Sequence, residues 1–467
     1  MTETLHSTAA QREERDSMGS LLVPAEALYG AQTQRAVLNF PVSGQAMPSS
    51  FIRALLLIKA AAASSNGTLG IIADADARAI REASHELLGW EDARLMAQFP
   101  VDVFQTGSGT STHMNANEVI ATLAARKLGR PIHPNDHVNA GQSSNDVVPS
   151  AIHVAAALAL HRRLLPALDH LVQALHDKAA SVHHHIKTGR THLMDAMPVR
   201  LSQVLDGWAA QMLGAKEHLK AVQPALQRLA LGGTAVGTGV NADPRFAAEC
   251  CRALSELCGL DFVPGANRFA LMGGQDVAVA ASGALKVVAV ALMKMANDLR
   301  WMNSGPLAGL AEIELEALQP GSSIMPGKVN PVIPEAAAMV AAQVIGNDCA
   351  ITVAGQSGNF ELNVMLPLVA RNLLESIELL AQVLPLLADK AIASFKVNEQ
   401  RLQETLARNP VLVTALNPLI GYARAAAIAK QAYSEGRPII DVAAQCTDIP
   451  RATLEKLLDP TQLTGIG

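Results

Sequence analysis

Residues 321–331 read Gly-Ser-Ser-Ile-Met-Pro-Gly-Lys-Val-Asn-Pro, a composition that is hard to explain as packing. The glycines and prolines predict a loop, because glycine adopts positive φ and proline cannot continue a helix or a β-ladder. Two hydroxyls, an ammonium and an amide lie within this loop. The apolar run at residues 336–345 predicts a helix that begins near Pro334 and Glu335. A polar loop that leads into a helix N-terminus suits a negatively charged, oxygen-rich ligand.

The composition favours a large, mainly α-helical protein. With 467 residues the chain can bury cores in two or three domains. Hydrophobic residues make up 49% of it but aromatic residues only 3%, which favours long, closely packed helices. The formal net charge of −5 provides no basic field for nucleic acid. Five cysteines without a C-x-x-C motif predict reduced thiols in a cytoplasmic protein.

Neither the N-terminal segment nor the most apolar segment of the chain predicts association with a membrane. Residues 1–15 are polar and lack the apolar core of a secretory signal. The most apolar segment, residues 277–295, is interrupted by Lys286 and Lys294. A buried bundle helix explains this segment better than a membrane span.

Apolar residues at helical spacing predict an elongated bundle of five long helices, each about 30–48 Å long at 1.5 Å per residue. These helices are expected at residues 151–180, 201–229, 277–303, 335–354 and 361–392. We expect a loosely held arm at residues 1–20 and short strands and turns at residues 23–41. Three domains are predicted: an N-terminal domain (1–146), a central long-helix bundle (147–396) and a small helical C-terminal domain (397–467).

Two further polar stretches precede helical segments. Residues 106–110, Thr-Gly-Ser-Gly-Thr, offer backbone N–H groups and hydroxyls, although a simple glycine-rich turn fits equally well. Residues 142–146, Gln-Ser-Ser-Asn-Asp, offer neighbouring side chains that could orient a carboxylate. Asp146 also suits the N-cap of a helix that begins at Pro149, so we leave it out of the site.

Histidines occur in two stretches of note. Residues 189–195 place His192 beside Arg190 and Thr191, which modestly favours a chemical role over a structural one. The run at residues 183–185 is three histidines and resembles a metal-binding tract. Adjacent residues of a helix point in different directions, so we interpret this run as a solvated helix face and expect no metal site.

Several other chemistries lack their sequence patterns here. The chain has no G-x-S-x-G elbow, no G-x-G-x-x-G after a strand and no Walker loop, and its metal-ligand spacings are absent. Hydroxyls with one histidine and one lysine remain, a set that suits holding a small acid and moving a proton.

Together these stretches resemble the fumarase/aspartase superfamily along nearly the whole chain. Residues 321–331 match its signature almost letter for letter, and residues 29–35 look like the N-terminal domain of class II fumarases. Further similar stretches are residues 105–110, 133–136, 142–146, 189–193, 231–239 and 358–363. The resemblance implies a mainly α, three-domain fold and a homotetramer with a 20-helix core. It also implies active sites that are each built from three chains.

The resemblance implies reversible anti hydration of fumarate to L-malate through an aci-carboxylate intermediate, without a cofactor. Ser322 would be the base, activated by Lys328 and backbone amides, and His192, oriented by Glu335, would act on the leaving group. Lys328, Asn330 and Ser323 would stabilise the developing charge. The remaining residues expected to bind the dicarboxylate are Ser108, Gly109, Thr110, Ser143, Ser144, Asn145, Thr191 and Val329.

A peripheral carboxylate site is also implied by the resemblance. Its residues would be Arg130, His133, Pro134, Asn135 and Asp136. The sequence departs from its relatives at three positions, where His113 replaces a usual asparagine, His137 a usual acid and Met194 a usual glutamine.

Three functions remain open on the sequence. Thr191-His192 and Ser143-Ser144-Asn145 look like a fumarate hydratase, since aspartases tend to carry glutamine at the position of His192. Aspartate ammonia-lyase activity, which releases fumarate and ammonia from L-aspartate, is the alternative. A binding or structural protein on an inactive lyase scaffold is a third hypothesis, against which the intact Ser322 and Lys328 argue.

Overall fold

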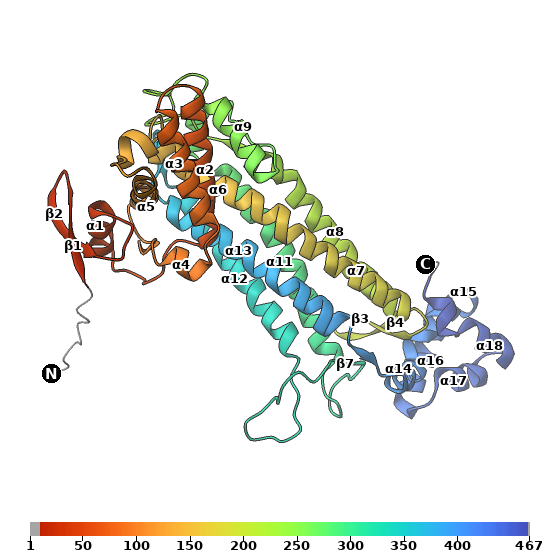
Figure 1. The fold of residues 1–467 in the computed structure, drawn as a ribbon. Helices are drawn as coiled ribbons and strands as arrows, with labels where there is room; N and C mark the ends of the chain where they lie inside the picture. The colour runs from red at the N-terminus through yellow and green to blue at the C-terminus, as the bar shows by residue number, and fades with distance from the viewer. Residues whose placement is uncertain (1–9, 466–467) are drawn as a thin grey trace. The chain divides into compact units, whose positions relative to one another are not determined.

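The computed structural model describes residues 10–465, and the fold is mainly α, as the sequence predicts (Figure 1). Long apolar segments form the predicted helices, with boundaries shifted by a few residues. The long helices are α6 (Ser144–Ala159), continued by a π-turn (Leu160–Leu164) and α7 (Leu165–Ser181), α8 (Leu201–Leu226), α11 (Asp276–Met302), α12 (Val332–Gly355) and α13 (Leu366–Leu387), continued by a π-turn (Ala388–Ile392).

The chain divides into two compact units, and every long helix contributes residues to both, with α6 and α7 taken as one helix. The first unit comprises Met1–Leu165, Glu217–Val287 and Gln343–Leu380. The second comprises Pro166–Lys216, Val288–Ala342 and Ala381–Gly467.

In the first unit, helix α2 (Ser49–Thr68) packs against α3 (Asp74–Leu88), α6 and α9 (Phe246–Cys258), and it buries Phe51, Ile52 and Leu55 completely or almost completely. The shorter helices of this unit are α1 (Ala31–Asn39), α2 (Ser49–Thr68), α3 (Asp74–Leu88), α4 (Asp92–Met96), α5 (Thr110–Leu128), a π-turn (Pro134–Val138), α9 (Phe246–Cys258) and α10 (Arg268–Gly273). Its strands are β1 (Gln11–Asp16), β2 (Gly19–Pro24), β5 (Arg228–Leu229), β6 (Val263–Pro264), β8 (Gly358–Asn359) and β9 (Leu362–Asn363).

The second unit joins the hairpin of β3 (Ile186–Thr191) and β4 (Met194–Arg200) to a set of short C-terminal helices. These helices bury a cluster of their own around Leu416, Val442 and Leu454. The short elements are β3 (Ile186–Thr191), β4 (Met194–Arg200), β7 (Ile313–Glu314), β10 (Lys396–Val397), α14 (Glu399–Ala407), a 3-10 helix (Pro410–Leu416), α15 (Asn417–Ile420), α16 (Tyr422–Glu435), α17 (Ile439–Cys446), α18 (Arg451–Leu457) and a second 3-10 helix (Pro460–Leu463).

The predictions for the N-terminal region are partly wrong. Residues 1–9 of the expected arm lie outside the described residues, but residues 11–24 form the antiparallel hairpin of β1 and β2. Arg35 ties this hairpin to α1 through an ion pair with Asp16 at 2.8 Å. Helix α1 lies where strands and turns were expected. The carboxylate of Glu118 accepts N–H bonds at its N-terminus, a contact that local sequence does not reveal.

Two helix starts and the interpretation of the histidine run also differ from prediction. Helix α6 begins at Ser144, so Pro149 lies inside the helix instead of at its start. Helix α13 begins at Leu366, after the short hairpin of β8 and β9. Helix α7 ends at Ser181, so the three histidines at residues 183–185 do not lie on a helix face.

Helices α11 and α12 are long and apolar enough to cross a membrane by length and composition, a test that core helices of globular proteins also pass. In the first unit Lys286 and Ser282 of α11 both donate to the buried carboxylate of Asp348 on α12, at 2.6 and 2.7 Å. This polar contact between neighbouring helices favours the bundle interpretation.

Candidate active site

The loop that precedes α12 is closed by its own hydrogen bonds. Gly321 N–H donates to the Lys328 carbonyl at 2.7 Å, and the Asn330 side chain donates to the Gly321 carbonyl at 2.7 Å. The Lys328 ammonium donates to Asn330 Oδ1 at 2.8 Å. The lysine and asparagine are therefore held beside each other at one end of the loop.

The Ser322 hydroxyl oxygen accepts two backbone hydrogen bonds inside the loop. They come from Ile324 N–H at 3.2 Å and Met325 N–H at 3.0 Å. Amides aimed at an oxygen stabilise negative charge on it, which is what an alkoxide base needs. In this conformation the Lys328 ammonium bonds to Asn330. The two amides are thus the groups that the structure places on Ser322.

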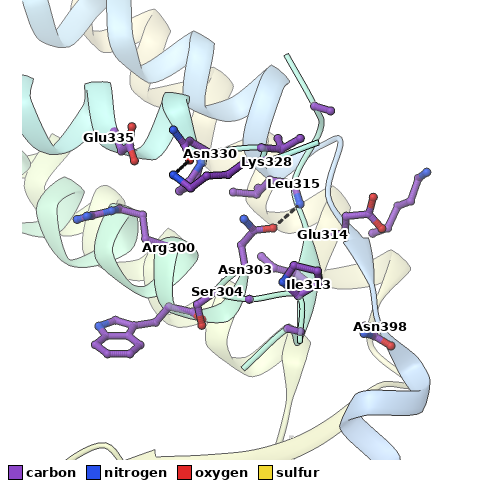
Figure 2. Close-up of a pocket in the computed structure, with 18 of the residues that line it drawn as sticks. Arg300, Asn303, Ser304, Ile313, Glu314, Leu315, Lys328, Asn330, Glu335 and Asn398 are labelled. Atoms are coloured by element: carbon purple, nitrogen blue, oxygen red, sulfur yellow. Dashed lines mark hydrogen bonds between the residues drawn. The ribbon is translucent and has the colours of Figure 1, made fainter. Parts of the chain in front are cut away.

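A cavity of about 1100 Å³ lies against this loop within the second unit (Figure 2). Lys328, Val329 and Asn330 line it, and Glu335 of α12 lies on the same wall. Several other polar residues also line the cavity, and no sequence pattern predicted them. These are Asn297, Arg300, Asn303, Ser304, Glu314, Lys396 and Asn398.

His192 lies at the exposed tip of the hairpin between β3 and β4. Both turn residues adopt left-handed backbone conformations, with φ of 57° at His192 and 61° at Leu193. Two-residue hairpin turns of this kind usually carry Asn-Gly, because other residues are strained there. Strain of about 1–3 kcal/mol per residue tends to persist where function requires a particular side chain. Among the described contacts, no hydrogen bond or ion pair joins His192 to Glu335 of this chain.

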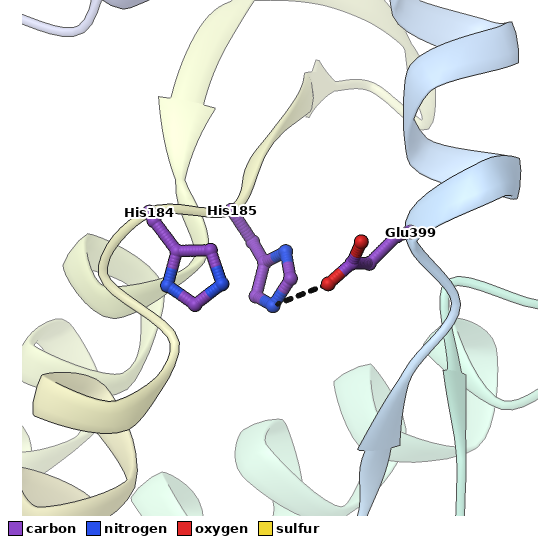
Figure 3. Close-up of side chains that lie close together, drawn as sticks. All are labelled: His184, His185 and Glu399. Atoms are coloured by element: carbon purple, nitrogen blue, oxygen red, sulfur yellow. Dashed lines mark ion pairs between the residues drawn. The ribbon is translucent and has the colours of Figure 1, made fainter.

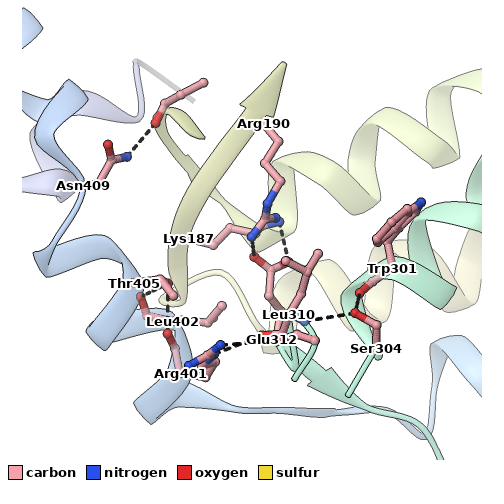
Figure 4. A network of polar contacts seen from close by, with 12 residues as sticks. Lys187, Arg190, Trp301, Ser304, Leu310, Glu312, Arg401, Leu402, Thr405 and Asn409 are labelled. Carbon is pink, nitrogen blue, oxygen red and sulfur yellow. Dashed lines mark hydrogen bonds and ion pairs between the residues drawn. The ribbon is translucent and has the colours of Figure 1, made fainter. Parts of the chain in front are cut away.

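A buried ion triad anchors the strand that leads to this tip (Figure 4). Glu312 accepts from Lys187 and from Arg190 of β3, each at 2.7 Å. The side chains of Glu312 and Lys187 are 3% and 7% exposed. Arg401 of α14 donates to main-chain carbonyls just before Glu312, at 3.2 Å. The segment is thus fixed from two sides.

In the first unit, the N-terminus of α5 presents the glycine-rich stretch. The hydroxyls of Ser108 and Thr110 lie 2.8 Å apart. A Cβ on Gly107 would lie 1.6 Å from the Val364 carbonyl oxygen, so the backbone approaches too closely for any other residue. The stretch is therefore a packed helix start with two adjacent hydroxyls, which suits an anion.

The N-terminus of α6 carries the second hydroxyl set. Ser143 is the N-cap, and it forms a capping box with Asp146. Asn145 donates to the Ala235 carbonyl at 2.8 Å. Asp146 accepts N–H bonds from the segment at residues 232–234, and burial raises its pKa to about 6 against these bonds and the nearby Lys59. Asp146 is thus structural, as the third helical residue of a capping box, and the prediction that it is the N-cap of a helix beginning at Pro149 is wrong.

His113 and Ser144 form a buried pair beneath these helix starts. His113 Nδ1 lies 2.7 Å from Ser144 Oγ, while its Nε2 is buried without a hydrogen-bond partner. Burial first, and then the charge of Lys59, lowers the pKa of His113 well below its usual value. Burial also lowers the pKa of Lys59 to about 7. A neutral imidazole therefore adjoins a hydroxyl of the expected substrate-binding set.

The expected peripheral residues surround a π-turn. His133 is its N-cap, and Asp136 N–H donates to His133 Nδ1 at 3.2 Å. A cavity of about 780 Å³ in the first unit is lined by His133, Pro134 and Asn135, and also by Arg126. Arg130 forms an ion pair with Asp76 and, like Asp136, is not among the lining residues.

The site residues predicted from the sequence therefore form two sets. Ser108, Gly109 and Thr110 lie near α6 in the first unit, where Gly109 faces Val148. The second unit holds the hairpin with Thr191 and His192, and the loop with Ser322, Ser323, Lys328 and Asn330. The hydroxyls, amides and single ammonium of this loop suit a small dicarboxylate.

Long helices with polar loops at their starts are typical of lyases that are built on a helix bundle. Comparison with protein-family models indicates the same class. The family model described as "Lyase" matches residues 19–346, and the one described as "Fumarase C C-terminus" matches residues 412–465. The chain belongs to this lyase family, and relatives that are 70% and 58% identical over 98% of it place it among the class II fumarate hydratases.

Individual relatives span nearly the full chain. Fumarate hydratase class II 2 of Pseudomonas aeruginosa is 70% identical over 456 residues, which cover 98% of this chain and 99% of that protein. Fumarate hydratase class II of Xylella fastidiosa is 58% identical over 98% of this chain and 96% of its own length. The crystal structure of class II fumarase from Schistosoma mansoni has a TM-score of 0.94 at 37% identity, and the match covers 97% of this chain and 99% of that one.

Proposed function

We propose that this enzyme is a hydro-lyase that interconverts fumarate and L-malate. The observation that carries the proposal is 70% identity over 456 residues to a protein named as a class II fumarate hydratase. The hydroxyl-rich helix starts and the Lys328–Asn330 pair provide matching chemistry for a dicarboxylate. The same relatives favour hydration over the aspartate ammonia-lyase alternative.

In the malate-to-fumarate direction, Ser322 would remove the C3 proton, and its two backbone amide bonds would stabilise the alkoxide. The resulting aci-carboxylate is a dianion. Lys328 and Asn330, already paired at 2.8 Å, would stabilise it as charge develops. His192 would protonate the leaving hydroxyl or order the water that does so.

We propose a homotetramer in which each active site draws on three chains. Leu193 and Met194, beside His192 at the hairpin tip, are 67% and 69% exposed. Apolar side chains on the bundle helices are also exposed, including Val290 of α11 and Met339 of α12 at 56% and 68%. Exposed apolar surface of this kind is typical of a subunit interface. Glu335 would then orient His192 of another copy.

We further propose that the enzyme acts in the cytoplasm. All five cysteines are free thiols, as expected in a reducing compartment.

We also propose that the site around the π-turn Pro134–Val138 takes a carboxylate on the entry route. His133 and Asn135 at the cavity, together with Arg126, offer donors to an anion.

Paired assays with L-malate and L-aspartate test the activity. Purified enzyme with L-malate is expected to produce fumarate, measured by its ultraviolet absorbance, whereas L-aspartate is expected to release no ammonia. Turnover of aspartate without turnover of malate would transfer the assignment to the ammonia-lyase. Turnover of neither would favour an inactive scaffold.

Replacing His113 with leucine is expected to raise the KM for L-malate about 5-fold, the equivalent of one hydrogen bond of ~1 kcal/mol. Ser144 must donate its hydroxyl hydrogen to a substrate carboxylate, so His113 Nδ1 would donate to Ser144 Oγ and orient it. Asparagine also carries an N–H donor, so His113→Asn is expected to raise KM less. An unchanged KM in a folded His113→Leu enzyme would remove this positioning role.

A further inference from the structure

Three potential metal ligands from two segments come together at one end of β3 (Figure 3). His184 and His185 belong to the turn between α7 and β3, and Glu399 is the first residue of α14. One ligand atom from each side chain lies within 4.8 Å of the others. All three residues belong to the second unit.

The backbone explains why two adjacent histidines share one side. Helix α7 ends at Ser181 and β3 begins at Ile186, so the histidines are free of helical geometry. Their ring centroids are 3.9 Å apart, with the planes tilted by 42°. The interpretation of residues 183–185 as a solvated helix face is wrong, because it assumed that adjacent histidines point in different directions.

The spacing of the atoms differs from that of an ordinary histidine–carboxylate hydrogen bond. His185 Nε2 and Glu399 Oε1 are 3.6 Å apart, whereas His170 Nε2 and Asp389 Oδ1 in the same unit lie at 2.6 Å. Zinc binds nitrogen and oxygen ligands at about 2.0–2.2 Å in a tetrahedron, which separates neighbouring ligand atoms by roughly 3.4 Å. The His185–Glu399 distance therefore fits an ion between the two atoms. His184 is exposed, and its ligand atom lies within 4.8 Å of the other two.

The charges are also suitable for a divalent cation. A neutral imidazole is the form that binds metals, and the exposed Glu399 carboxylate supplies one negative charge. Two imidazoles and one carboxylate are a ligand set that zinc accepts, with water in the fourth position.

We propose that His184, His185 and Glu399 bind one divalent transition-metal ion, with zinc as the preferred ion. The ion would link the turn before β3 to the N-terminus of α14. None of the three residues belongs to the proposed reaction. The ion would therefore stabilise the second unit and leave turnover unchanged.

Isothermal titration of zinc chloride into untagged, EDTA-treated full-length enzyme tests the site. One saturable ion per chain is expected, together with a zinc-dependent rise in the unfolding temperature. His185→Ala and Glu399→Gln are each expected to weaken binding at least ~10-fold and to abolish the rise, since losing a ligand costs more than losing its supporting contacts. L-Malate turnover of both variants should match the parent, which shows that they fold.

Two other histidine variants are matched controls. His183→Ala removes the third histidine of the run, whose Nδ1 lies 3.2 Å from the Ser202 hydroxyl. His170→Ala removes the directly bonded pair of His170 and Asp389. Both are expected to bind zinc like the parent. The proposal is overturned if the parent shows no saturable binding, if His185→Ala and Glu399→Gln bind like the parent, or if either control loses binding to the same extent.

Discussion

Replacing Ser322 with alanine is expected to lower kcat for L-malate by about 100- to 10,000-fold, the usual contribution of a positioned acid or base. The alanine keeps the loop closure made by Gly321, Lys328 and Asn330, because those bonds do not involve the serine side chain. It removes only the hydroxyl that accepts the two backbone amides. Steady-state rates of fumarate formation measure the effect, and size-exclusion chromatography checks the assembly.

Ser357→Ala is a suitable control for this variant. The Ser357 hydroxyl donates to the Val353 carbonyl at the end of α12, and we place it outside the site. Its kcat is expected to match the parent. A Ser322→Ala enzyme that kept more than about a tenth of the parent kcat, a loss below roughly 1.4 kcal/mol, would show that Ser322 is not the base.

Replacing Glu312 with glutamine is expected to destabilise the enzyme by about 3–5 kcal/mol, the usual effect of breaking a buried ion pair from one side. The substitution keeps the shape but leaves Lys187 and Arg190 without their carboxylate. Burial lowers the pKa of Lys187 and the Glu312 carboxylate opposes this shift, so the lysine would tend to lose its proton in the variant. Turnover is expected to fall as well, because Arg190 precedes Thr191 and His192 on the same hairpin.

Thermal unfolding of the two proteins measures this prediction. Glu435→Gln is the control, because the Glu435–Arg437 pair is exposed and surface pairs contribute little. Its unfolding temperature should equal that of the parent. If Glu312→Gln also unfolded at the parent temperature, the triad would not hold the hairpin.

The long helices could be predicted because their apolar residues recur at helical spacing over many turns, as in α11 and α12. The regions that differ depend on contacts between residues far apart in the sequence. Helix α1 is capped by Glu118, more than 80 residues away. Helix α6 begins before Pro149 because Ser143 and Asp146 complete a capping box there. Local sequence propensity does not reveal a cap that comes from a distant residue such as Glu118. Pro149 itself suggests a helix start, so the capping box that precedes it was not predicted.

The site shows the same division. The residues of the Gly-Ser-Ser loop could be named from sequence because several polar side chains lie within residues 321–331. Arg300 and Asn398 line the same cavity, but they come from a bundle helix and from the start of α14, where nothing in the local pattern marks them. The contact between His113 and Ser144 could not be predicted either, because the two residues lie 31 positions apart in the sequence.

The left-handed His192–Leu193 corner has a consequence for engineering this enzyme. Glycine at such a corner would relieve backbone strain, so selection for heat resistance alone would favour replacing these residues. The same replacement at His192 would delete the imidazole assigned to the leaving group. Any directed-evolution campaign on this chain would therefore need to score turnover alongside heat resistance, or it would drift toward a sturdier and slower catalyst.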